Sequence, residues 1–143
     1  MLRTSLVTTT FSLILAALVG CGGGDDGLHQ ISGQVSVEGT PIDQGSITFL
    51  SADGGTPSAG GVIREGAYQA NVPPGEKIVL VLGSKVVGQT PIMTGVPDSG
   101  MRDALETVTH RIYNAKHLTP LRAEVSGDNA SLNFELTKDG KGG

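Results

Sequence analysis

Hydrophobic and polar residues alternate along much of the chain. The clearest alternation covers residues 31–38, where Ile31, Gly33, Val35 and Val37 occupy every second position and polar residues fill the others. A period of two residues is typical of a β-strand with one buried face. The same period recurs in four further segments, at residues 46–49, 67–72, 121–125 and 130–136. These segments predict short strands that each contribute one face to a core.

Turn-forming residues separate these segments. Arg64-Glu65-Gly66 predicts a tight hairpin turn, and Pro73-Pro74-Gly75 is a second strong turn signal. Ile78–Leu82 is apolar at every position, which predicts a strand that is covered on both faces. Two antiparallel sheets packed face to face would bury the apolar faces of about seven such strands. We therefore expect an all-β, seven-stranded antiparallel β-sandwich over residues 29–138.

The segment from Gly83 to Lys116 is less well determined by its pattern. Met101, Ala104, Leu105 and Val108 have the i, i+3, i+4, i+7 spacing of an amphipathic helix. The β-branched residues that follow, Thr107-Val108-Thr109 and Ile112-Tyr113, favour a strand instead. Between these alternatives we favour a short helix or irregular loop at Pro97–Leu105, followed by a strand.

The first twenty residues have the organisation of an export signal. Arg3 precedes an uncharged stretch, and its most apolar part, Phe11–Val19, is too short to span a bilayer as a stable helix. The stretch ends in Leu18-Val19-Gly20-Cys21, which resembles the lipobox of bacterial prolipoproteins. We expect residues 1–20 to be a lipoprotein signal peptide that is cleaved between Gly20 and Cys21.

The lipobox resemblance implies that Cys21 is the site of lipidation. Its thiolate would accept a diacylglyceryl group and its freed amino group a further acyl chain such as palmitate, so that membrane lipid becomes its partner. The alternative is an ordinary secretory signal followed by an incidental cysteine; Cys21 is the only cysteine of the chain and has no disulfide partner within it. Residues 21–28 would form a flexible tether. We expect a cell-envelope protein, lipid-anchored on the exported side of a bacterial membrane.

Composition narrows the function classes. The 143 residues include 22 glycines and 7 prolines, which suit a turn-rich β-fold better than a helical bundle. The formal net charge is −4, with no tryptophan and no basic stripe, so we expect no nucleic-acid partner. The glycine- and lysine-containing residues 139–143 are expected to be a disordered tail.

Several short motifs resemble those of carboxypeptidase regulatory-like domains. The opening residues Ile31–Val35, Gly39–Ile42 and Ile47–Phe49, and the pair Gly66-Ala67-Tyr68 and Val72–Gly75, match the pattern of that family. Ile112–Asn114, Thr119–Leu121 and Ala123–Val125 are similar to the closing part of small bacterial lipoproteins that carry this domain. The resemblance covers most of Ile31–Leu136 except residues 83–111. It implies a transthyretin-like (immunoglobulin-like) seven-stranded sandwich that serves as a non-catalytic accessory module.

The residues do not form a recognisable catalytic or metal-binding motif. His29, His110 and His117 have no zinc-ligand spacing, and no G-x-S-x-G nucleophile motif occurs. The neighbouring carboxylates Asp25 and Asp26 lie in the predicted tether, where no pocket would surround them. The oxygen atoms of Asp53-Gly54-Gly55 leave a weak surface calcium site open. We therefore predict a protein that is not an enzyme and has neither cofactor nor bound metal.

Ligand binding remains the main alternative to a purely structural role. Phe49, Tyr68 and Phe134 share the register of core residues, whereas Tyr113 is the aromatic residue with a plausible surface position. Tyr113, Asn114 and His117 are thus candidate ligand or partner contacts, although a structural hydrogen bond of the Tyr113 hydroxyl is the favoured interpretation. We predict a non-catalytic envelope interaction or structural module whose partner is an envelope protein or glycan; the alternative is a glycan- or small-ligand-binding module with its site in residues 83–117.

Overall fold

The computed structural model describes residues 27–128 and 130–142, and this part of the chain is almost entirely β-strand. The predicted signal peptide and Cys21 lie outside the described residues. The elements are β1 (His29–Val37), β2 (Thr40–Pro41), β3 (Gln44–Ser51), β4 (Ala59–Arg64), β5 (Ala67–Val72), β6 (Gly75–Pro91), β7 (Met101–Thr107), the 3₁₀ helix η1 (Arg111–Asn114), β8 (Arg122–Val125), β9 (Ala130–Ser131) and β10 (Phe134–Leu136). The prediction of an all-β protein is confirmed.

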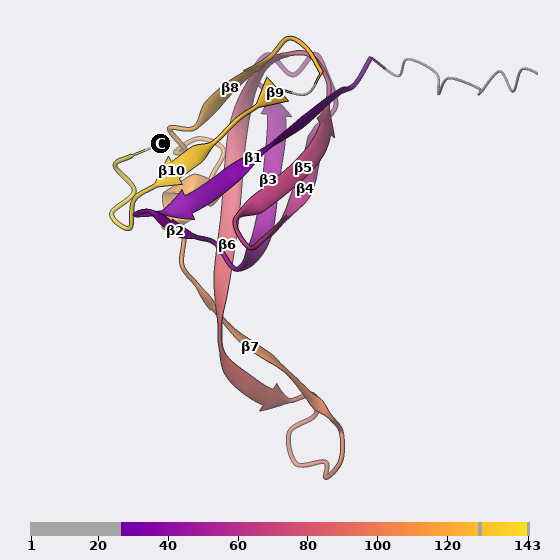
Figure 1. Cartoon of the computed structure of the whole chain (residues 1–143), viewed down its shortest axis with the longest axis vertical. Coiled ribbons are helices and arrows are strands. Elements are labelled where there is room, and N and C mark those ends of the chain that lie inside the picture. The colour runs from indigo at the N-terminus through magenta and orange to yellow at the C-terminus, as the bar shows by residue number, and fades with distance from the viewer. Residues whose placement is uncertain (1–26, 129, 143) are drawn as a thin grey trace, which may run out of the picture.

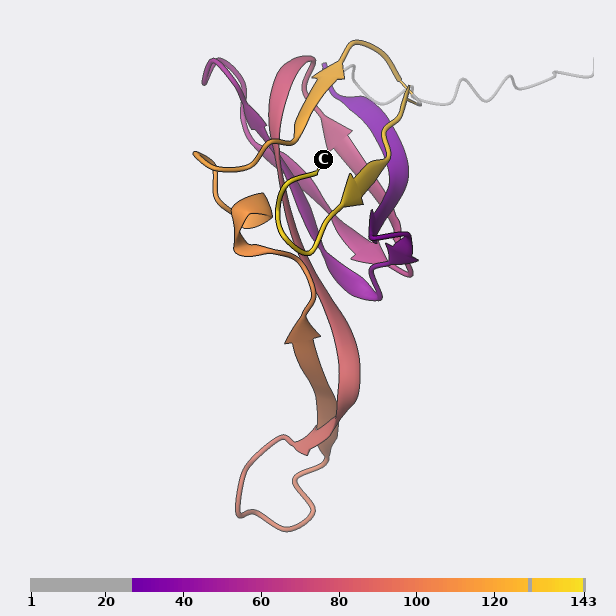
Figure 2. The ribbon, with the colours of Figure 1, turned by 90° about the vertical axis from the view of Figure 1, so that its left-hand side faces the viewer.

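The strands form one hydrogen-bonded network in the order β10-β1-β5-β4-β3-β6-β7 (Figure 1). In addition, β2 and β9 pair with β1, and β8 pairs with β6. The sheet curls around its core, and η1 with the C-terminal segment lies over the open side (Figure 2). Most pairs are antiparallel, but β9 and β10 run parallel to β1. The predicted purely antiparallel pairing is wrong here, because the chain crosses over after β8 and returns along β1 in the same direction.

The alternation of β1 is confirmed, since Ile31, Val35 and Val37 are all buried. The predicted tight turn is also present between β4 and β5. Glu65 and Gly66 have φ angles of 50° and 80°. Two successive residues with positive φ are typical of a type I′ turn, whose twist matches that of the flanking strands.

The core is built from the inward-facing residues of the strands together with Tyr113 and Leu121. As predicted, Phe49, Tyr68 and Phe134 point inward, and their rings form a row with centroids 6.1 and 6.5 Å apart. The Tyr68 hydroxyl donates to the carbonyl oxygen of Leu132 at 2.7 Å, which satisfies the polar end of this buried ring.

The outer face of β6 differs from the prediction. Val79 and Val81 are fully buried on the inner face, but Ile78 and Leu80 on the outer face are only half-buried and Leu82 is exposed. No described element lies over this side of the strand, so the predicted cover on both faces is wrong. The outer apolar residues instead form part of the surface described below.

Residues 83–111 also fold differently from the prediction. The strand β6 continues to Pro91, and β7 occupies Met101–Thr107, so the predicted helix or loop is wrong from Met101 onward. The predicted strand at Ile112-Tyr113 is instead the 3₁₀ helix η1. The physical reason is that β6 offers residues 101–107 a hydrogen-bonding edge, whereas a helix there would have had no core to pack against.

The C-terminal residues are packed rather than disordered as far as the structure describes them. The backbone N–H groups of Lys141 and Gly142 both donate to Thr137 Oγ1 at 3.0 Å. Gly140 is buried beside His110 and Ile112. The predicted tail at residues 139–143 is therefore wrong for residues 139–142, because Thr137 offers their amide groups an acceptor.

Candidate interaction surface

The most distinctive feature of the molecule is a long hairpin made by β6 and β7 (Figures 1 and 2). The pairing of β3 with β6 ends at Gln44 and Ser84. Beyond Ser84, β6 pairs with β7 alone, in a register that runs from Ser84 opposite Thr107 to Pro91 opposite Met101. The hairpin therefore leaves the body of the sheet as a two-stranded ribbon.

Local backbone features shape this ribbon and its tip. A bulge lies between Val86 and Gly88, where Gly88 adopts a φ of 155°. Such a bulge increases the local twist. The tip loop is closed by the Ile92 N–H, which donates to the Gly100 carbonyl at 3.0 Å, and by Ser99 Oγ, which bonds both the N–H and the carbonyl of Met93. The hairpin is thus an ordered extension with a defined end.

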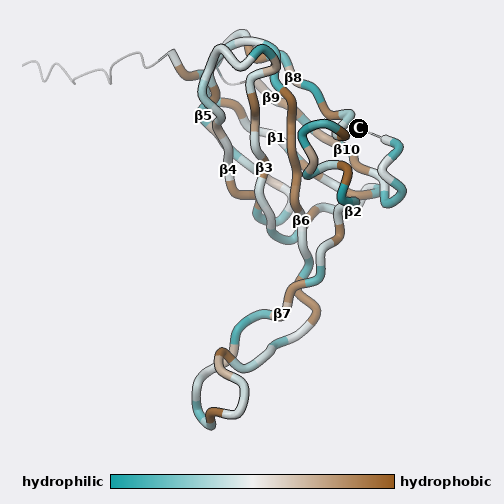
Figure 3. The backbone as a smooth tube through the Cα atoms, turned by 180° about the vertical axis from the view of Figure 1, so that it is seen from behind, coloured by the Kyte–Doolittle hydropathy of each residue, from teal (hydrophilic) through white to brown (hydrophobic). Residues whose placement is uncertain are grey.

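Exposed apolar side chains gather on this hairpin. Of the eleven large hydrophobic side chains exposed in the described residues, seven belong to residues 86–105: Val86, Val87, Ile92, Met93, Val96, Met101 and Leu105. Figure 3 shows the corresponding hydrophobic segments along β6, β7 and the tip loop. The exposed apolar side chains are thus concentrated on one extended element rather than scattered over the described surface.

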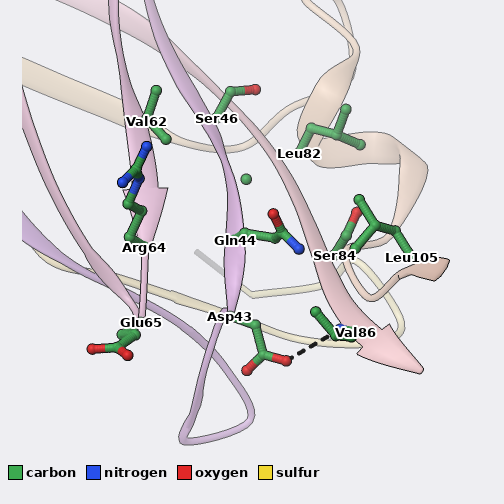
Figure 4. A pocket seen from close by; sticks show the side chains of 11 residues that line it. Asp43, Gln44, Ser46, Val62, Arg64, Glu65, Leu82, Ser84, Val86 and Leu105 are labelled. Atoms are coloured by element: carbon green, nitrogen blue, oxygen red, sulfur yellow. Dashed lines mark hydrogen bonds between the residues drawn. The ribbon is translucent and has the colours of Figure 1, made fainter. Parts of the chain in front are cut away.

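A groove lies at the base of the hairpin, on the outer face of β4, β3 and β6 (Figure 4). Its volume is about 810 Å³. The apolar part of its lining comes from one side chain each of β4 and β7 and two of β6, namely Val62, Leu105, Leu82 and Val86. Arg64, Glu65 and Asp43 contribute charge at the rim. Asp43 Oδ2 accepts a hydrogen bond from the Val86 N–H at 3.3 Å, which ties the hairpin to the β2–β3 connection.

Charged residues accompany the apolar ones along the ribbon. Lys85 on β6 lies directly opposite Glu106 on β7, and their side chains form an exposed ion pair of 3.5 Å. Arg102 lies opposite Thr90 on the same strand pair. Asp103 lies opposite Gln89. The ribbon therefore carries two cations and two anions within a short length, an arrangement that can select the register of a partner strand.

The residues that the sequence singled out lie in different environments. Tyr113 is fully buried in η1; its hydroxyl donates to the Gly142 carbonyl and accepts from the Thr137 N–H at 3.0 Å. Asn114 and His117 are exposed beside it. Tyr113 thus has the structural hydrogen bonds that the favoured interpretation describes, and in this structure it offers no surface to a ligand. Gly20 and Cys21 lie outside the described residues.

A polar cluster surrounds a buried lysine beside the Asp53-Gly54-Gly55 loop; the sequence singled out this loop but not the lysine. Lys77 is almost completely buried and its Nζ donates to Thr56 Oγ1 at 2.7 Å. Nearby, Asp53 accepts from Ser51 Oγ and from the Gly55 N–H at 2.8 Å. These two hydrogen bonds, and to a lesser extent the Lys77 charge, lower the pKa of Asp53. The alternation of residues along β6 places Lys77 on the same face as Val79 and Val81. This alternation could have predicted from the sequence that Lys77 is buried.

Within the described residues, no group of three or more histidine, cysteine, aspartate or glutamate side chains is arranged to hold a metal ion. The same part of the chain contains no helix of the length and apolar character that a bilayer crossing requires.

Comparison with known proteins finds few similarities. No protein-family model matches the chain, and no curated protein matches it. Among solved structures, the chain is similar to a 9R-lipoxygenase from Cyanothece PCC8801, with 16% sequence identity and a TM-score of 0.36. The match covers 94% of this chain and spans 18% of the lipoxygenase. A TM-score of this size supports no inference about fold or activity.

Proposed function

We propose that this chain is a lipid-anchored, non-catalytic module of the cell envelope that binds a partner through the β6–β7 hairpin. The observation that carries the proposal is the hairpin itself, which projects beyond the body and exposes apolar side chains along its length and at its tip. Exposing such side chains to water is unfavourable, and contiguous exposed apolar surface typically marks an interaction site.

The proposed anchor is Cys21, supported by the lipobox-like residues Leu18–Cys21. The start of β1, which follows the proposed tether, lies at the end of the molecule away from the hairpin tip (Figure 1). A protein tethered by this end would hold the tip away from the membrane surface. An anchored presenter of an interaction element is the role that this placement favours.

For the body we propose the transthyretin-like seven-stranded sandwich of carboxypeptidase regulatory-like domains. Two of the family-like motifs support this proposal by the positions they occupy. Gly66-Ala67-Tyr68 follows directly from the β4–β5 turn with Tyr68 in the core, and Val72–Gly75 connects β5 to β6. In this arrangement the body is a rigid support for the hairpin.

The anchor is tested by replacing Cys21 with alanine and fractionating cells. The protein with Cys21 should sediment with membranes, and the Cys21→Ala variant should pass into the soluble fraction, since no acceptor for the lipid remains. Sedimentation of the variant with membranes, resistant to washing with salt, would contradict the anchor.

The hairpin is tested by placing a photo-crosslinking residue at its tip in living cells. Position Val96 is exposed in the tip loop, and position Gln69 is an exposed control on β5 of the body. We expect a discrete cross-linked product at Val96 that disappears when Leu105→Glu is added, because the glutamate places a charge in the apolar surface. Equal amounts of cross-linked product at Val96 and Gln69 would contradict the proposal that the hairpin binds the partner.

A second candidate function, the binding of a small ligand, is favoured by the groove at the hairpin base. Its lining combines aliphatic side chains with Arg64, Glu65 and Asp43 and contains no aromatic residue. This suits a small amphipathic ligand better than a sugar, because sugar rings typically stack on aromatic faces. Leu82→Glu should then abolish ligand binding without lowering the thermal stability, since Leu82 is exposed on the outer face.

A further inference from the structure

The strand β7 forms one end of the sheet order, and its side away from β6 pairs with no other strand of the described residues. It is seven residues long, so its free edge presents a row of backbone N–H and C=O groups. Such an edge is a template for another strand, which adds to the sheet through main-chain hydrogen bonds.

The ribbon also has a physical reason to acquire further strands. Beyond Ser84 it consists of β6 and β7 only, and isolated two-stranded hairpins are at best marginally stable in water. Val86 and Leu105 lie opposite each other on one face and are both exposed. Additional strands beside β7 would extend the hydrogen bonding and reduce the exposure of this apolar pair.

We propose that the partner of β7 is β7 of a second copy of this chain, paired antiparallel about a two-fold axis at Ala104. This inference rests on the proposed function only in that the hairpin is the interacting element; it does not depend on the anchor. In this register Arg102 of each copy lies opposite Glu106 of the other. Glu106 then lies between Lys85 of its own chain and Arg102 of the second copy, so charges alternate across the joined strands.

The neighbouring two-fold registers lack this complementarity. Because a two-fold axis perpendicular to the sheet must pass through a residue pair, the axis can move only in steps of one residue along β7. An axis at Asp103 would place two like charges directly opposite each other, which is destabilising. An axis at Leu105 would oppose Ala104 to Glu106 and form no charge pair. The charges of this edge therefore select one register instead of preventing pairing.

The same register brings together the exposed apolar side chains of the two copies. Met101 and Leu105 lie on the face of β7 opposite to that of Arg102 and Glu106, because side chains alternate along a strand. Beside them, Val86 and Leu82 continue the apolar surface toward the body. Pairing about Ala104 would place the Met101 and Leu105 side chains of both copies on one face of a four-stranded sheet. Asp103 shares this face and lies opposite Leu105 of the second copy.

Cysteine cross-linking of the full chain tests this pairing. Ala104→Cys places a thiol at the two-fold axis, whereas Gln69→Cys places one on the exposed face of β5 as a matched control. Both variants are prepared with Cys21 and with Cys21→Ser, so that the anchor and the pairing are read separately. After mild oxidation we expect a disulfide-linked dimer for Ala104→Cys in both backgrounds and none for Gln69→Cys. Absence of this dimer, or equal dimers from both positions, would overturn the proposal.

Charge reversal tests the register. Arg102→Glu in the Ala104→Cys chain should reduce the cross-linked dimer about tenfold, because two attractive pairs become repulsive. Adding Glu106→Arg and Lys85→Glu reverses the whole row and should restore the dimer, since the signs alternate again. Thermal unfolding of each variant shows that the body is intact. A dimer unaffected by Arg102→Glu, or not restored by the triple reversal, would contradict the pairing.

Discussion

At the scale of single residues, Gly33 is the glycine of the described residues that leaves least room for a side chain. A Cβ atom at this position would lie 1.8 Å from the carbonyl oxygen of Leu132, which also accepts the Tyr68 hydroxyl hydrogen bond. Replacement would push apart β1 and the segment that leads into β10. Glycine is therefore needed for space here rather than for an unusual backbone conformation.

We expect Gly33→Ala to lower the free energy of unfolding by roughly 2–3 kcal/mol, because the added methyl group overpacks a contact made by backbone atoms. Gly127→Ala is the control, since no atom lies within 4 Å of a Cβ at that position. Denaturant unfolding of both variants checks the difference. Equal stability of the two variants would mean that the β1 contact can relax without cost.

Tyr113 offers a test that separates a structural role from a ligand contact. Its ring is fully buried and its hydroxyl is bonded to Thr137 and Gly142. Tyr113→Phe should cost about 1 kcal/mol through the lost hydrogen bonds. Tyr113→Ala should cost about 4 kcal/mol through the cavity. The ligand-binding alternative would be favoured if Tyr113→Ala lost ligand binding while its melting temperature barely changed.

Asp53 predicts a dependence of stability on pH. The Ser51 hydroxyl and the Gly55 N–H lower its pKa below the ordinary value of 3.8. A pKa that is lower in the folded state means that the ionised carboxylate stabilises the fold above pH 3.8 and that this contribution is lost as the pH falls through the folded pKa. Asp53→Asn should therefore reduce the melting temperature at about pH 7 and have little effect at about pH 2. If the difference in melting temperature between the unchanged protein and Asp53→Asn were the same at both pH values, the ionised Asp53 carboxylate would not be the stabilising group.

At the scale of elements, local patterns predicted well where one face of a strand is buried. The alternation of β1 correctly predicted that strand, and the turn signal at Glu65-Gly66 correctly predicted the turn between β4 and β5. The spacing of Met101, Ala104 and Leu105 was ambiguous because none of these side chains reaches the core, so neither period was enforced by burial. The choice of strand depended on the edge of β6, which a local pattern does not report.

The hairpin should be separable from the body. None of the core side chains belongs to residues 85–107. Replacing residues 87–104 by Asn-Gly would join Val86 to Leu105, which are register partners, by a two-residue turn. We expect the midpoint of thermal unfolding to stay within about 5 °C of that of the full chain. A collapse of stability would show that the hairpin is part of the folding unit.

At the scale of the whole molecule, the candidate surface was only partly predictable. The alternative ligand site predicted within residues 83–117 includes the hairpin, but its aromatic candidate, Tyr113, is buried. The apolar run Ile78–Leu82 predicted cover on both faces, and only one face is covered. A run of apolar residues shows that a strand can be covered, but only the arrangement of all elements shows that one of its faces has no cover in this chain.

The opposite placement of the start of β1 and the hairpin tip has a consequence for spacing. His29 pairs with Val72, close to the start of β6 at Gly75, and Ala104 pairs with Gly88. Thirteen residues of strand separate Gly75 from Gly88, a length of about 43 Å at 3.3 Å per residue. If both copies carry the proposed lipid anchor, a pair joined at Ala104 would hold the two anchored ends about 85 Å apart. The proposed tether at residues 21–28 would reach only ~12–15 Å on average. Both anchors could therefore enter one bilayer only if the pair lay along the bilayer surface. A pair that stood upright would link two bilayers.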